Sequence, residues 1–523
     1  MCRILFLLLL FICASCAQKQ ENNTTARFNL FTEPPSLDPR YATDITSCNL
    51  LLQLFEGLVR FDSNHQIQLA DAQSIDISPD GLTYTIALKE NSWSNGKTVT
   101  SHDYVETWKE ILTPLFAAPF AYKLFVIKNA RAVKTGELPI SNLGLKTLDD
   151  RRFEITLENP TPFFLELLAF PTFFPTLRGL DEQWAADASS NYISNGPYQL
   201  TSWVHDGEIT LTPNPHYFDR EKVKLDRIEF CMIEDAITEF YMFEQGEIDW
   251  AGSPFSNIPP EVAPTLMKEK RLQTYTTTGT YFLQLNTDCY PLHNSNIRRA
   301  LALAINRSAL INHVFQLDHT VAQSFIPNLP DFKDDRIAFN DASFFEAKKL
   351  FEQGLEQEGL TIATFPTLTL SYNTSKQHQK IMQAIQQQWY DTLGLRVNLE
   401  ASDWKAYLAQ IARKDYDICR FGWMAECFDP MSFLVLFKTV QSDGVNYTGW
   451  HNKEYAQLLD HAETELNQNA RAQILASAET ILMEHMPIIP ICHLNFAYLA
   501  NARLKGVYTS PLGVIDLKEA RFQ

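Results

Sequence analysis

The 523-residue chain is poor in glycine, in positive charge and in long apolar runs, and each shortage excludes a class of protein. Its 19 glycines are too few for a collagen-like or linker-like composition. Lysine and arginine number 44 against 62 aspartates and glutamates, so the formal net charge is −18. No nucleic-acid partner is expected, because phosphate binding needs clustered positive charge. Beyond the N-terminus, no stretch approaches the roughly 20 apolar residues that span a bilayer.

The common catalytic signatures are also missing. The chain has no H-E-x-x-H, G-x-S-x-G or G-x-G-x-x-G motif, and Asn91 stands where a phosphate loop ending at Gly96-Lys97-Thr98 needs its first glycine. The 12 histidines lie scattered, without the spacing of metal ligands. The sequence leaves a catalytic carboxylate pair open, but we expect no enzyme activity, no cofactor and no resident metal.

Cysteine is sparse, with nine residues and no C-x-x-C pair. This pattern favours neither a zinc ribbon nor a disulfide-dense scaffold. We expect buried free thiols beyond the N-terminal region, and disulfide pairing is the alternative. These thiols are Cys48, Cys231, Cys289, Cys419, Cys427 and Cys492.

Residues 1–15 have the pattern of a secretory signal peptide. Arg3 supplies a positive charge, an apolar run covers 4–13, and Ala14-Ser15-Cys16 follows. The last three residues resemble a bacterial lipobox, in which the cysteine is lipidated, although Cys13 stands where that pattern usually has Leu, Val or Ile. We expect Cys16 to carry a lipid anchor, with 16–26 as a polar tether. A cleaved signal without a lipid, or a buried N-terminus, is the alternative.

What the chain has in abundance is apolar and aromatic residues, 45% and 12% of the total, enough for large buried cores. Its length indicates about three domains. Strand-like alternation marks 82–88 and 153–157, with shorter strands at 397–399 and 416–419. Apolar residues at helical spacing follow the capping residues 101–103, and they recur at 163–170, 298–314 and 375–393. Gly394 would end the last of these helices. The mixture predicts α/β lobes.

A series of motifs then resembles the bacterial family 5 solute-binding proteins, which are the oligopeptide-, dipeptide- and nickel-binding receptors of ABC importers. The order of the motifs over residues 33–490 carries the resemblance, and it is strongest to the oligopeptide receptors. The motifs are Glu33-Pro34-Pro35-Ser36-Leu37-Asp38-Pro39, Leu54-Phe55-Glu56-Gly57-Leu58, Asp80-Gly81 with Trp93-Ser94-Asn95-Gly96, Asn195-Gly196-Pro197-Tyr198, Gly246-Glu247-Ile248-Asp249, Ile297-Arg298-Arg299-Ala300-Leu301, Trp423-Met424-Ala425-Glu426 and Pro487-Ile488-Ile489-Pro490.

The resemblance implies a periplasmic-binding-protein-like α/β fold of the class II (cluster C) type, with two lobes around a ligand cleft and a third, appended domain. The implied boundaries are domain I at 27–58, 181–280 and 488–523, domain II at 59–180, and domain III, the second lobe, at 281–487. The implied function is a lipid-anchored periplasmic receptor that captures oligopeptides and delivers them to the permease of an inner-membrane importer. We expect a monomer that contacts the membrane through its lipid.

The resemblance also implies the ends of the ligand site. Glu426 stands where the family has an aspartate that pairs with the amino terminus of the peptide. Arg420 matches a basic residue near the carboxyl end, and the chain around Gly422 would offer main-chain groups to an extended ligand. Another family arginine is replaced by Ile411, and Arg413 is close enough to substitute for it. A solvated acid at 426 and an interlobe ion pair at 420 are the alternatives.

Four further residues match segments that line the cleft in the family. Trp404 and Trp423 match aromatic positions of side-chain pockets, and Asn49 and His493 fall near other lining segments, with ordinary packing as the alternative for each. At the level of function, the alternatives are the same scaffold binding a peptidoglycan-derived peptide, a nickel chelate, haem or a sugar, or an enzyme or adhesin built on it.

Overall fold

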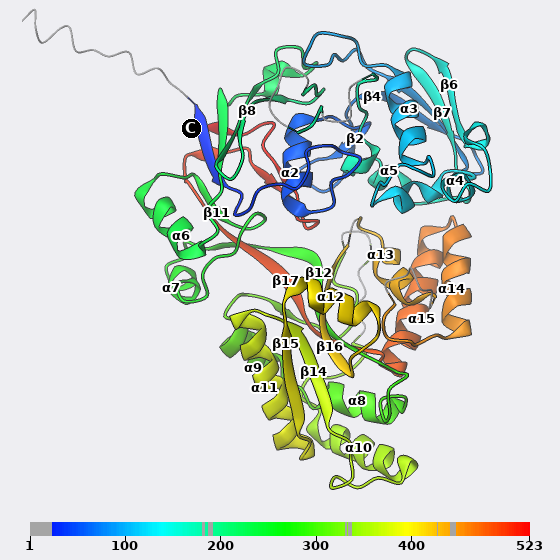
Figure 1. Ribbon diagram of the computed structural model, residues 1–523, viewed down its shortest axis with the longest axis vertical. Coiled ribbons are helices and arrows are strands. Elements are labelled where there is room, and N and C mark those ends of the chain that lie inside the picture. The colour runs from blue at the N-terminus through cyan, green and yellow to red at the C-terminus, as the bar shows by residue number, and fades with distance from the viewer. Residues whose placement is uncertain are drawn as a thin grey trace, which may run out of the picture.

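The computed structural model describes residues 24–179, 184–186, 192–329, 332, 337–425, 427–439 and 446–523. In these ranges the chain forms an upper and a lower lobe, as oriented in Figure 1. The apolar core of the upper lobe collects buried residues between Ala26 and Phe255 and again between Leu504 and Ala520. The core of the lower lobe lies between Tyr281 and Cys492. The upper lobe therefore combines both ends of the described chain.

The largest sheet runs through both lobes. Among the described residues its strand order is β15-β14-β16-β12-β17-β11-β1-β10-β9-β8, with β13 paired to β17. These strands are β1 (Thr25–Asn29), β8 (Tyr198–Val204), β9 (Glu208–Pro213), β10 (Arg227–Cys231), β11 (Trp250–Gly252), β12 (Gln273–Leu285), β13 (Thr320–Val321), β14 (Leu368–Asn373), β15 (Val397–Ser402), β16 (Ile418–Met424) and β17 (Ile488–Ala500). β1 begins inside the segment 16–26 that we expected to be a tether.

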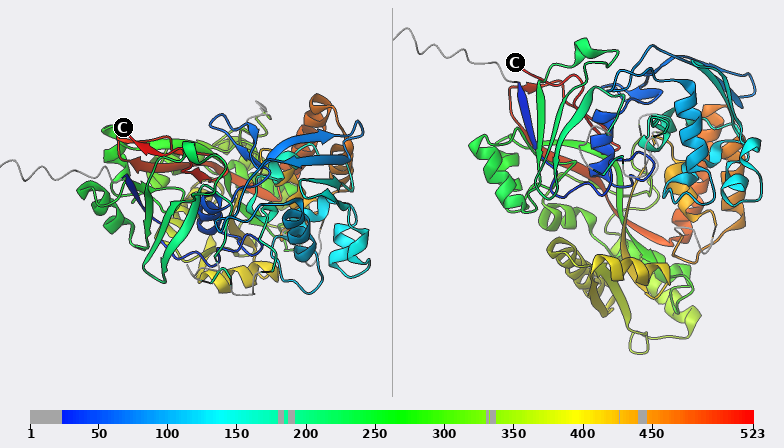
Figure 2. Two further views of the ribbon diagram at one scale, coloured as in Figure 1. Left: turned by 90° about the horizontal axis from the view of Figure 1, so that it is seen from above. Right: turned by 45° about the horizontal axis from the view of Figure 1, so that its top comes forward.

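Strands β12 and β17 connect the two lobes. They pair antiparallel from Gln273 opposite Tyr498 in the upper lobe to Gln284 opposite Ile488 in the lower lobe. Figures 1 and 2 show both strands passing from one lobe to the other. Their register is interrupted between Thr276 and Thr280. A break in a ladder is a place where strands bend, so this pair is where we expect the two lobes to hinge.

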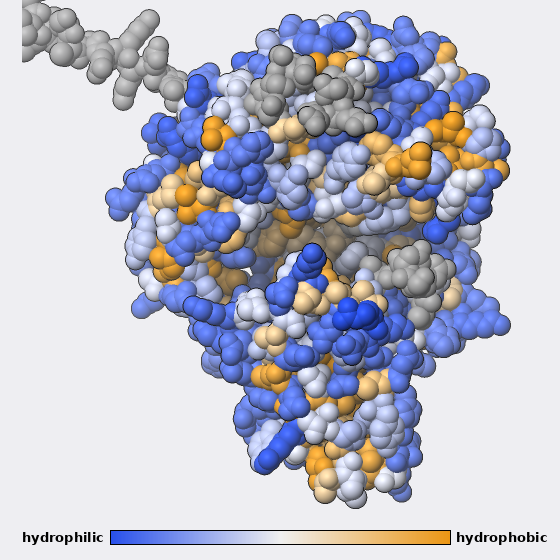
Figure 3. All heavy atoms as spheres, viewed as in Figure 1, coloured by the Kyte–Doolittle hydropathy of each residue, from blue (hydrophilic) through white to orange (hydrophobic). Residues whose placement is uncertain are grey.

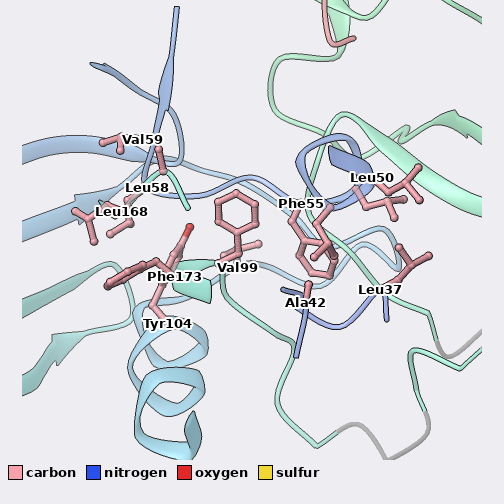
Figure 4. Packing of buried hydrophobic residues seen from close by; sticks show 14 of the residues in the cluster. Leu37, Ala42, Leu50, Phe55, Leu58, Val59, Val99, Tyr104, Leu168 and Phe173 are labelled. Atoms are coloured by element: carbon pink, nitrogen blue, oxygen red, sulfur yellow. The ribbon is translucent and has the colours of Figure 1, made fainter. Parts of the chain in front are cut away.

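A second sheet in the upper lobe has the order β4-β5-β7-β6. It consists of β4 (Ala72–Ile77), β5 (Thr83–Leu88), β7 (Arg152–Thr156) and β6 (Leu145–Asp149). The alternation that predicts a strand at 82–88 is confirmed, because alternate β5 residues are buried. Helix α3 (Ser101–Ile111) begins after Thr100, one residue before the predicted cap, and Thr100 and Asp103 form a capping box. In Figure 4, Tyr104 of α3 lies beside Phe173, near Leu58 and Leu168.

The remaining elements of the upper lobe are short and surround these sheets. They are α2 (Ile45–Leu54), β2 (Val59–Phe61), β3 (Ile67–Leu69), η2 (Ala121–Val126), α4 (Ala130–Lys134), η3 (Ile140–Asn142), α5 (Phe164–Leu167), η4 (Pro171–Phe173), η5 (Arg220–Lys222), α6 (Ala236–Gln245), α7 (Ala263–Lys268), β18 (Leu504–Lys505), β19 (Tyr508–Thr509), β20 (Ile515–Asp516) and β21 (Arg521–Phe522). The helix predicted at 163–170 was too long, because α5 ends at Leu167. Pro171 then begins η4, and a residue that precedes a proline disfavours the helical conformation.

The lower lobe is mostly helical around β14–β16. Its helices are α8 (Ser295–Leu303), α9 (Arg307–Leu310), a π-helical turn η6 (Ile311–Phe315), α10 (Phe344–Glu358), α11 (Lys376–Leu393), α12 (Trp404–Ala412), α13 (Met431–Leu434), η7 (Val435–Phe437), α14 (Lys453–Thr464) and α15 (Gln468–His485). Helix α11 confirms the prediction for 375–393: Ser375 caps its start and Gly394 ends it at φ 69°. Strand β16 reaches Met424, five residues beyond the predicted strand.

The predicted single helix at 298–314 was wrong, because the chain breaks after α8. Asn306 leaves the helical conformation and its side chain accepts a hydrogen bond from the Ala309 N–H, which starts α9 anew. The break directs Arg307 into the core, where it donates to the Pro490 carbonyl (2.7 Å) and pairs with Asp341 (3.4 Å). The single helix that the apolar spacing predicts is therefore interrupted where the Arg307 guanidinium is buried.

The described cysteines beyond the N-terminal region are free thiols, as expected, but burial is confirmed only for Cys419, Cys427 and Cys492, whereas Cys48, Cys231 and Cys289 are partly exposed. Residues 1–15 and Cys16 lie outside the described residues. Over the part of the chain that the structure describes, no helix combines the length and apolarity needed to cross a bilayer.

Candidate functional site

A cavity of about 360 Å³ lies at the junction of the two lobes. The upper lobe supplies most of its wall, through residues 43–61, 120–122, 166–174 and 508–516, and the lower lobe contributes Trp423, Met424 and Ala425. The space-filling view shows the hollow between the two lobes (Figure 3). Segments that are far apart in sequence therefore meet around one space.

Helix α2 forms one wall and is fixed to the C-terminal segment. Asp44 caps the helix by accepting the Ser47 N–H at 2.8 Å. The Asn49 amide donates to the Gly513 carbonyl (2.9 Å) and accepts from the Ile515 N–H (2.7 Å). Asn49 thus lines the cavity, and its hydrogen bonds hold the wall together.

A partly buried ionic cluster forms another part of the cavity wall. The Arg60 guanidinium bonds Glu56 at 3.0 Å and Asp516 at 2.7 Å. Tyr217 donates its hydroxyl to Glu56. Burial alone would lower the pKa of Arg60, but Asp516 and Glu56 raise it above its ordinary value. Because the cluster is paired internally, it acts as a rigid charged wall.

Much of the rest of the upper wall is apolar, although Glu166 and Tyr508 also line it. It includes Leu52 and Phe55 of α2, Val59 and Phe61 of β2, Phe120, and the segment Ala169, Phe170, Pro171 and Phe174. Cys48 also lines it, and burial together with the nearby Asp44 raises the pKa of the thiol to about 12. The thiol is therefore protonated at neutral pH and adds to the apolar surface.

The lower wall is the end of β16, which lies between β14 and β12. The Trp423 indole N–H donates to the Ser432 carbonyl at 2.8 Å, so its ring presents carbon to the cavity. The Ala425 N–H donates to the Thr278 carbonyl at 2.9 Å. Position 426 follows directly in the chain, but Glu426 lies outside the described residues.

Arg420 and Gly422 precede Trp423 on the same strand and do not line this cavity. The Arg420 guanidinium lies 4.9 Å from the centre of the Tyr281 ring and bonds Asn373 at 3.3 Å. Its Nε is buried and has no hydrogen-bond partner within the described residues. Burial, and then the charge of Arg420, lower the pKa of His378 to about 3, so the guanidinium is the one cation of this His378–Tyr281–Arg420 group.

The other predicted site residues lie away from the cavity. Trp404 begins α12 and is 55% exposed, and Arg413 caps the end of the same helix on the surface. His493 of β17 is buried and pairs with the Thr280 hydroxyl at 2.9 Å. Burial lowers the pKa of His493 to about 4, so this imidazole is neutral at pH 7. Binding roles for these residues stay predictions.

Sequence patterns did not reveal the ionic cluster or Glu166. Glu56 belongs to the motif Leu54-Phe55-Glu56-Gly57-Leu58, yet only the fold brings Arg60 and Asp516 to this glutamate. Glu166 of α5 accepts the Phe428 N–H from the lower lobe at 2.6 Å, and nothing in its local sequence marks it. Within the described residues, no group of three or more His, Cys, Asp or Glu side chains could hold a metal ion.

Two α/β lobes joined by a strand pair, with a cavity at their junction, define the solute-binding class of proteins. A family model described as bacterial extracellular solute-binding proteins, family 5, middle region, matches residues 66–444. The chain belongs to this family, and the predicted family and fold class are confirmed.

Individual relatives cover nearly the whole chain. It is 38% identical over 510 residues to the oligopeptide-binding protein OppA of Bacillus subtilis, covering 96% of this chain and 93% of that protein. Among solved structures, the Escherichia coli murein tripeptide-binding protein MppA has a TM-score of 0.82 and 29% identity, covering 96% and 99% of the two chains. Haemophilus influenzae OppA in complex with the peptide RPPGFSPFR has a TM-score of 0.80 and 28% identity, with the same coverage.

Proposed function

We propose that this protein captures oligopeptides between its two lobes and delivers them to the permease of an ABC importer, without performing chemistry. The observation that carries the proposal is the cavity at the lobe junction, in a chain whose relatives over nearly its whole length include the oligopeptide-binding protein of Bacillus subtilis and the peptide-bound protein of Haemophilus influenzae. A cavity of this size lies at the lower end of the range for ligand sites.

A peptide sets definite requirements for such a site. Its amine is protonated at neutral pH, its other end is a carboxylate, and its amides need partners once water is excluded. Glu426 would supply the anion for the amine, because Trp423, Met424 and Ala425 bring the chain to the cavity edge just before it. Strand β16 around Gly422 would supply main-chain partners in the manner of an added strand.

Arg420 would supply the cation for the carboxylate end. Its free Nε and its position on β16, three residues before Trp423 of the cavity wall, support that role, and a guanidinium matches a carboxylate in a bidentate pair. Arg413, Trp404 and His493 are weaker candidates, since they lie outside the cavity.

Binding would close the lobes about the β12–β17 hinge. A ligand shifts such an equilibrium only by binding the closed form better than the open form. The structure already has contacts across the lobes, including Phe428 against Phe61 at 5.3 Å between ring centres and the Phe428 N–H to the Glu166 carboxylate at 2.6 Å. The permease would then recognise the closed shape.

The family is extracellular, and we propose that Cys16 anchors this member to the bacterial membrane through a lipid, as a monomer. A second candidate ligand is a cell-wall peptide, favoured by the similarity to MppA, which is named for binding a murein tripeptide. That ligand also carries peptide groups, so it uses the same site.

Native mass spectrometry tests the proposal. The ligand-stripped protein is mixed with equal amounts of tri-, tetra- and pentapeptides, a nickel chelate, haem and a disaccharide. We expect one-to-one complexes with peptides only. Complexes with one of the other compounds and none with peptides would refute the proposal.

A further inference from the structure

One ring of the lower lobe is inserted between side chains of the upper lobe. Phe428 is buried, and its ring centre lies 5.3 Å from that of Phe61 and 5.7 Å from that of His65. Its backbone N–H donates to the Glu166 carboxylate at 2.6 Å. We call these four residues the latch. Because Phe61 and Glu166 also line the cavity, the latch lies beside the proposed ligand site.

His65 is the ring of the latch that can gain a proton. It lies in the turn between β2 and β3, with φ 62°, and its Nδ1 is 2.6 Å from the Tyr508 hydroxyl. Burial raises the pKa of Tyr508 to about 12, so this hydroxyl keeps its proton and can donate it to a neutral imidazole. An imidazolium has no acceptor nitrogen. Charging His65 therefore removes this hydrogen bond and buries a cation under Phe428 when the lobes close.

The acids of the elements around His65 already have partners. They are Asp62 of the same turn, which accepts the N–H groups of Asn64 and Gln66, Asp516 of β20, which pairs with Arg60, Glu166 of α5, which accepts the Phe428 N–H, and Asp429 beside Phe428, which pairs with Arg471. Asp62 raises the pKa of His65, but burial has the larger effect, and the pKa falls below its ordinary value. The closed arrangement therefore favours the neutral ring.

We propose that His65 makes the closure of the lobes on a peptide sensitive to pH, because the neutral ring holds Phe428 and the protonated ring favours the open form. The inference rests on the proposed function and adds regulation to it. Apparent affinity falls with the fraction of molecules that can close. If the ring has an ordinary pKa of about 6.5 in the open form, affinity falls by up to about tenfold between pH 7.5 and pH 5.5.

Two other histidines keep their charge in this range. Burial lowers the pKa of His378 to about 3 and that of His493 to about 4, so both are neutral at pH 5.5. Asp71 does change its charge, because burial raises its pKa to about 7. A variant at His65 separates the contribution of the latch from that of Asp71.

Calorimetry with tri-, tetra- and penta-alanine at pH 5.5 and pH 7.5 tests the inference on the full-length, ligand-stripped protein. We expect the tightest of the three peptides to bind about three- to tenfold more weakly at pH 5.5. His65→Asn introduces a side chain that cannot be charged, and asparagine tolerates a positive φ. This variant should reduce the difference between the two pH values to less than about twofold. His102→Asn, at an exposed position on α3, is the matched control and should keep the full difference.

Small-angle scattering of the ligand-free protein gives a second readout. The radius of gyration should rise from pH 7.5 to pH 5.5 in the unaltered protein and in His102→Asn, but not in His65→Asn. Equal affinity of the unaltered protein at the two pH values overturns the inference, and so does a pH dependence that His65→Asn retains. If no peptide gives heat at either pH, the proposed function is wrong. Scattering then decides the inference alone, and a radius that is constant in the unaltered protein overturns it.

Discussion

Glu166 of the upper lobe and Phe428 of the lower lobe are joined by a hydrogen bond of 2.6 Å from the Phe428 N–H to the Glu166 carboxylate. The Phe428 ring packs edge-on against Phe61, also of the upper lobe. The loop held in this way follows position 426, and it is fixed from its own side by the buried Asp429–Arg471 pair. The contact therefore exists only while the lobes are together.

Removing this contact should favour the open form. A hydrogen bond to a charged group contributes about 1.5–3 kcal/mol, so we expect Glu166→Ala to weaken peptide binding about tenfold and to increase the radius of gyration of the ligand-free protein. Small-angle scattering and calorimetry measure the two effects. Glu90→Ala, at a side chain 86% exposed, is the matched control. Unchanged scattering and unchanged peptide affinity in Glu166→Ala would show that the Glu166–Phe428 contact does not hold the lobes together.

Glu426 is predicted to bind the amine of the peptide. The Glu426→Gln variant should bind a free-amine peptide about 1.5–3 kcal/mol more weakly, as expected for a charge-assisted hydrogen bond. N-acetylation of the peptide should weaken binding to the unaltered protein by a similar amount. It should weaken binding to the Glu426→Gln variant only slightly further. If acetylation leaves the affinity of the unaltered protein unchanged, the amine is bound elsewhere.

Asp71 should make the stability of the upper lobe depend on pH. Burial, with a further contribution from Glu56, raises the pKa of this carboxyl to about 7 in the folded protein from 3.8. Between about pH 4 and pH 7 the folded state thus holds a proton that the unfolded state has lost, so the free energy of unfolding falls as the pH rises. Asp71→Asn keeps an acceptor for the Tyr104 hydroxyl, which lies at 2.8 Å.

We therefore expect Asp71→Asn to melt near the unaltered protein at pH 4.5 and above it at pH 8, measured by scanning calorimetry. Asp76→Asn, at an exposed position on β4, is the control. Parallel melting curves for the Asp71 variant and the unaltered protein across this range would mean that Asp71 ionises normally.

Cys16 is predicted to be the lipidated residue. Cells that express the protein should incorporate labelled fatty acid into it, and globomycin should block its processing. Cys16→Ser should abolish the label and release the protein from the membrane fraction, whereas Cys13→Ser should retain both. A mature N-terminus at any other residue, established by mass spectrometry, would reject the anchor.

Sequence patterns correctly predicted the helices and strands whose capping residues and apolar periodicity match the way they are buried in the fold. Helix α11 carries Ser375 and Gly394 at its ends, and β5 alternates as a half-buried strand does. The break after α8 was not predicted, because the burial of Arg307 against Pro490 depends on a strand 183 residues away. Sequence periodicity cannot report such a partner.

The site was predictable only where a family motif carries it. The motif ending at Glu426 pointed to Trp423, which lies in the cavity wall. The cavity wall and its ionic cluster depend on Arg60, Phe170 and Asp516, which come from three distant segments. Each reads as an ordinary surface or core residue until the fold brings the segments together.

If the junction of the two lobes is a peptide site, isothermal titration of the ligand-stripped protein with a mixed set of tri- to pentapeptides, followed by melting of each mixture, tests it most directly. We expect saturable one-to-one heat with at least one peptide, at micromolar affinity or better, and a matching rise in melting temperature. The absence of both heat and a thermal shift with every peptide would show that the junction is not a peptide site.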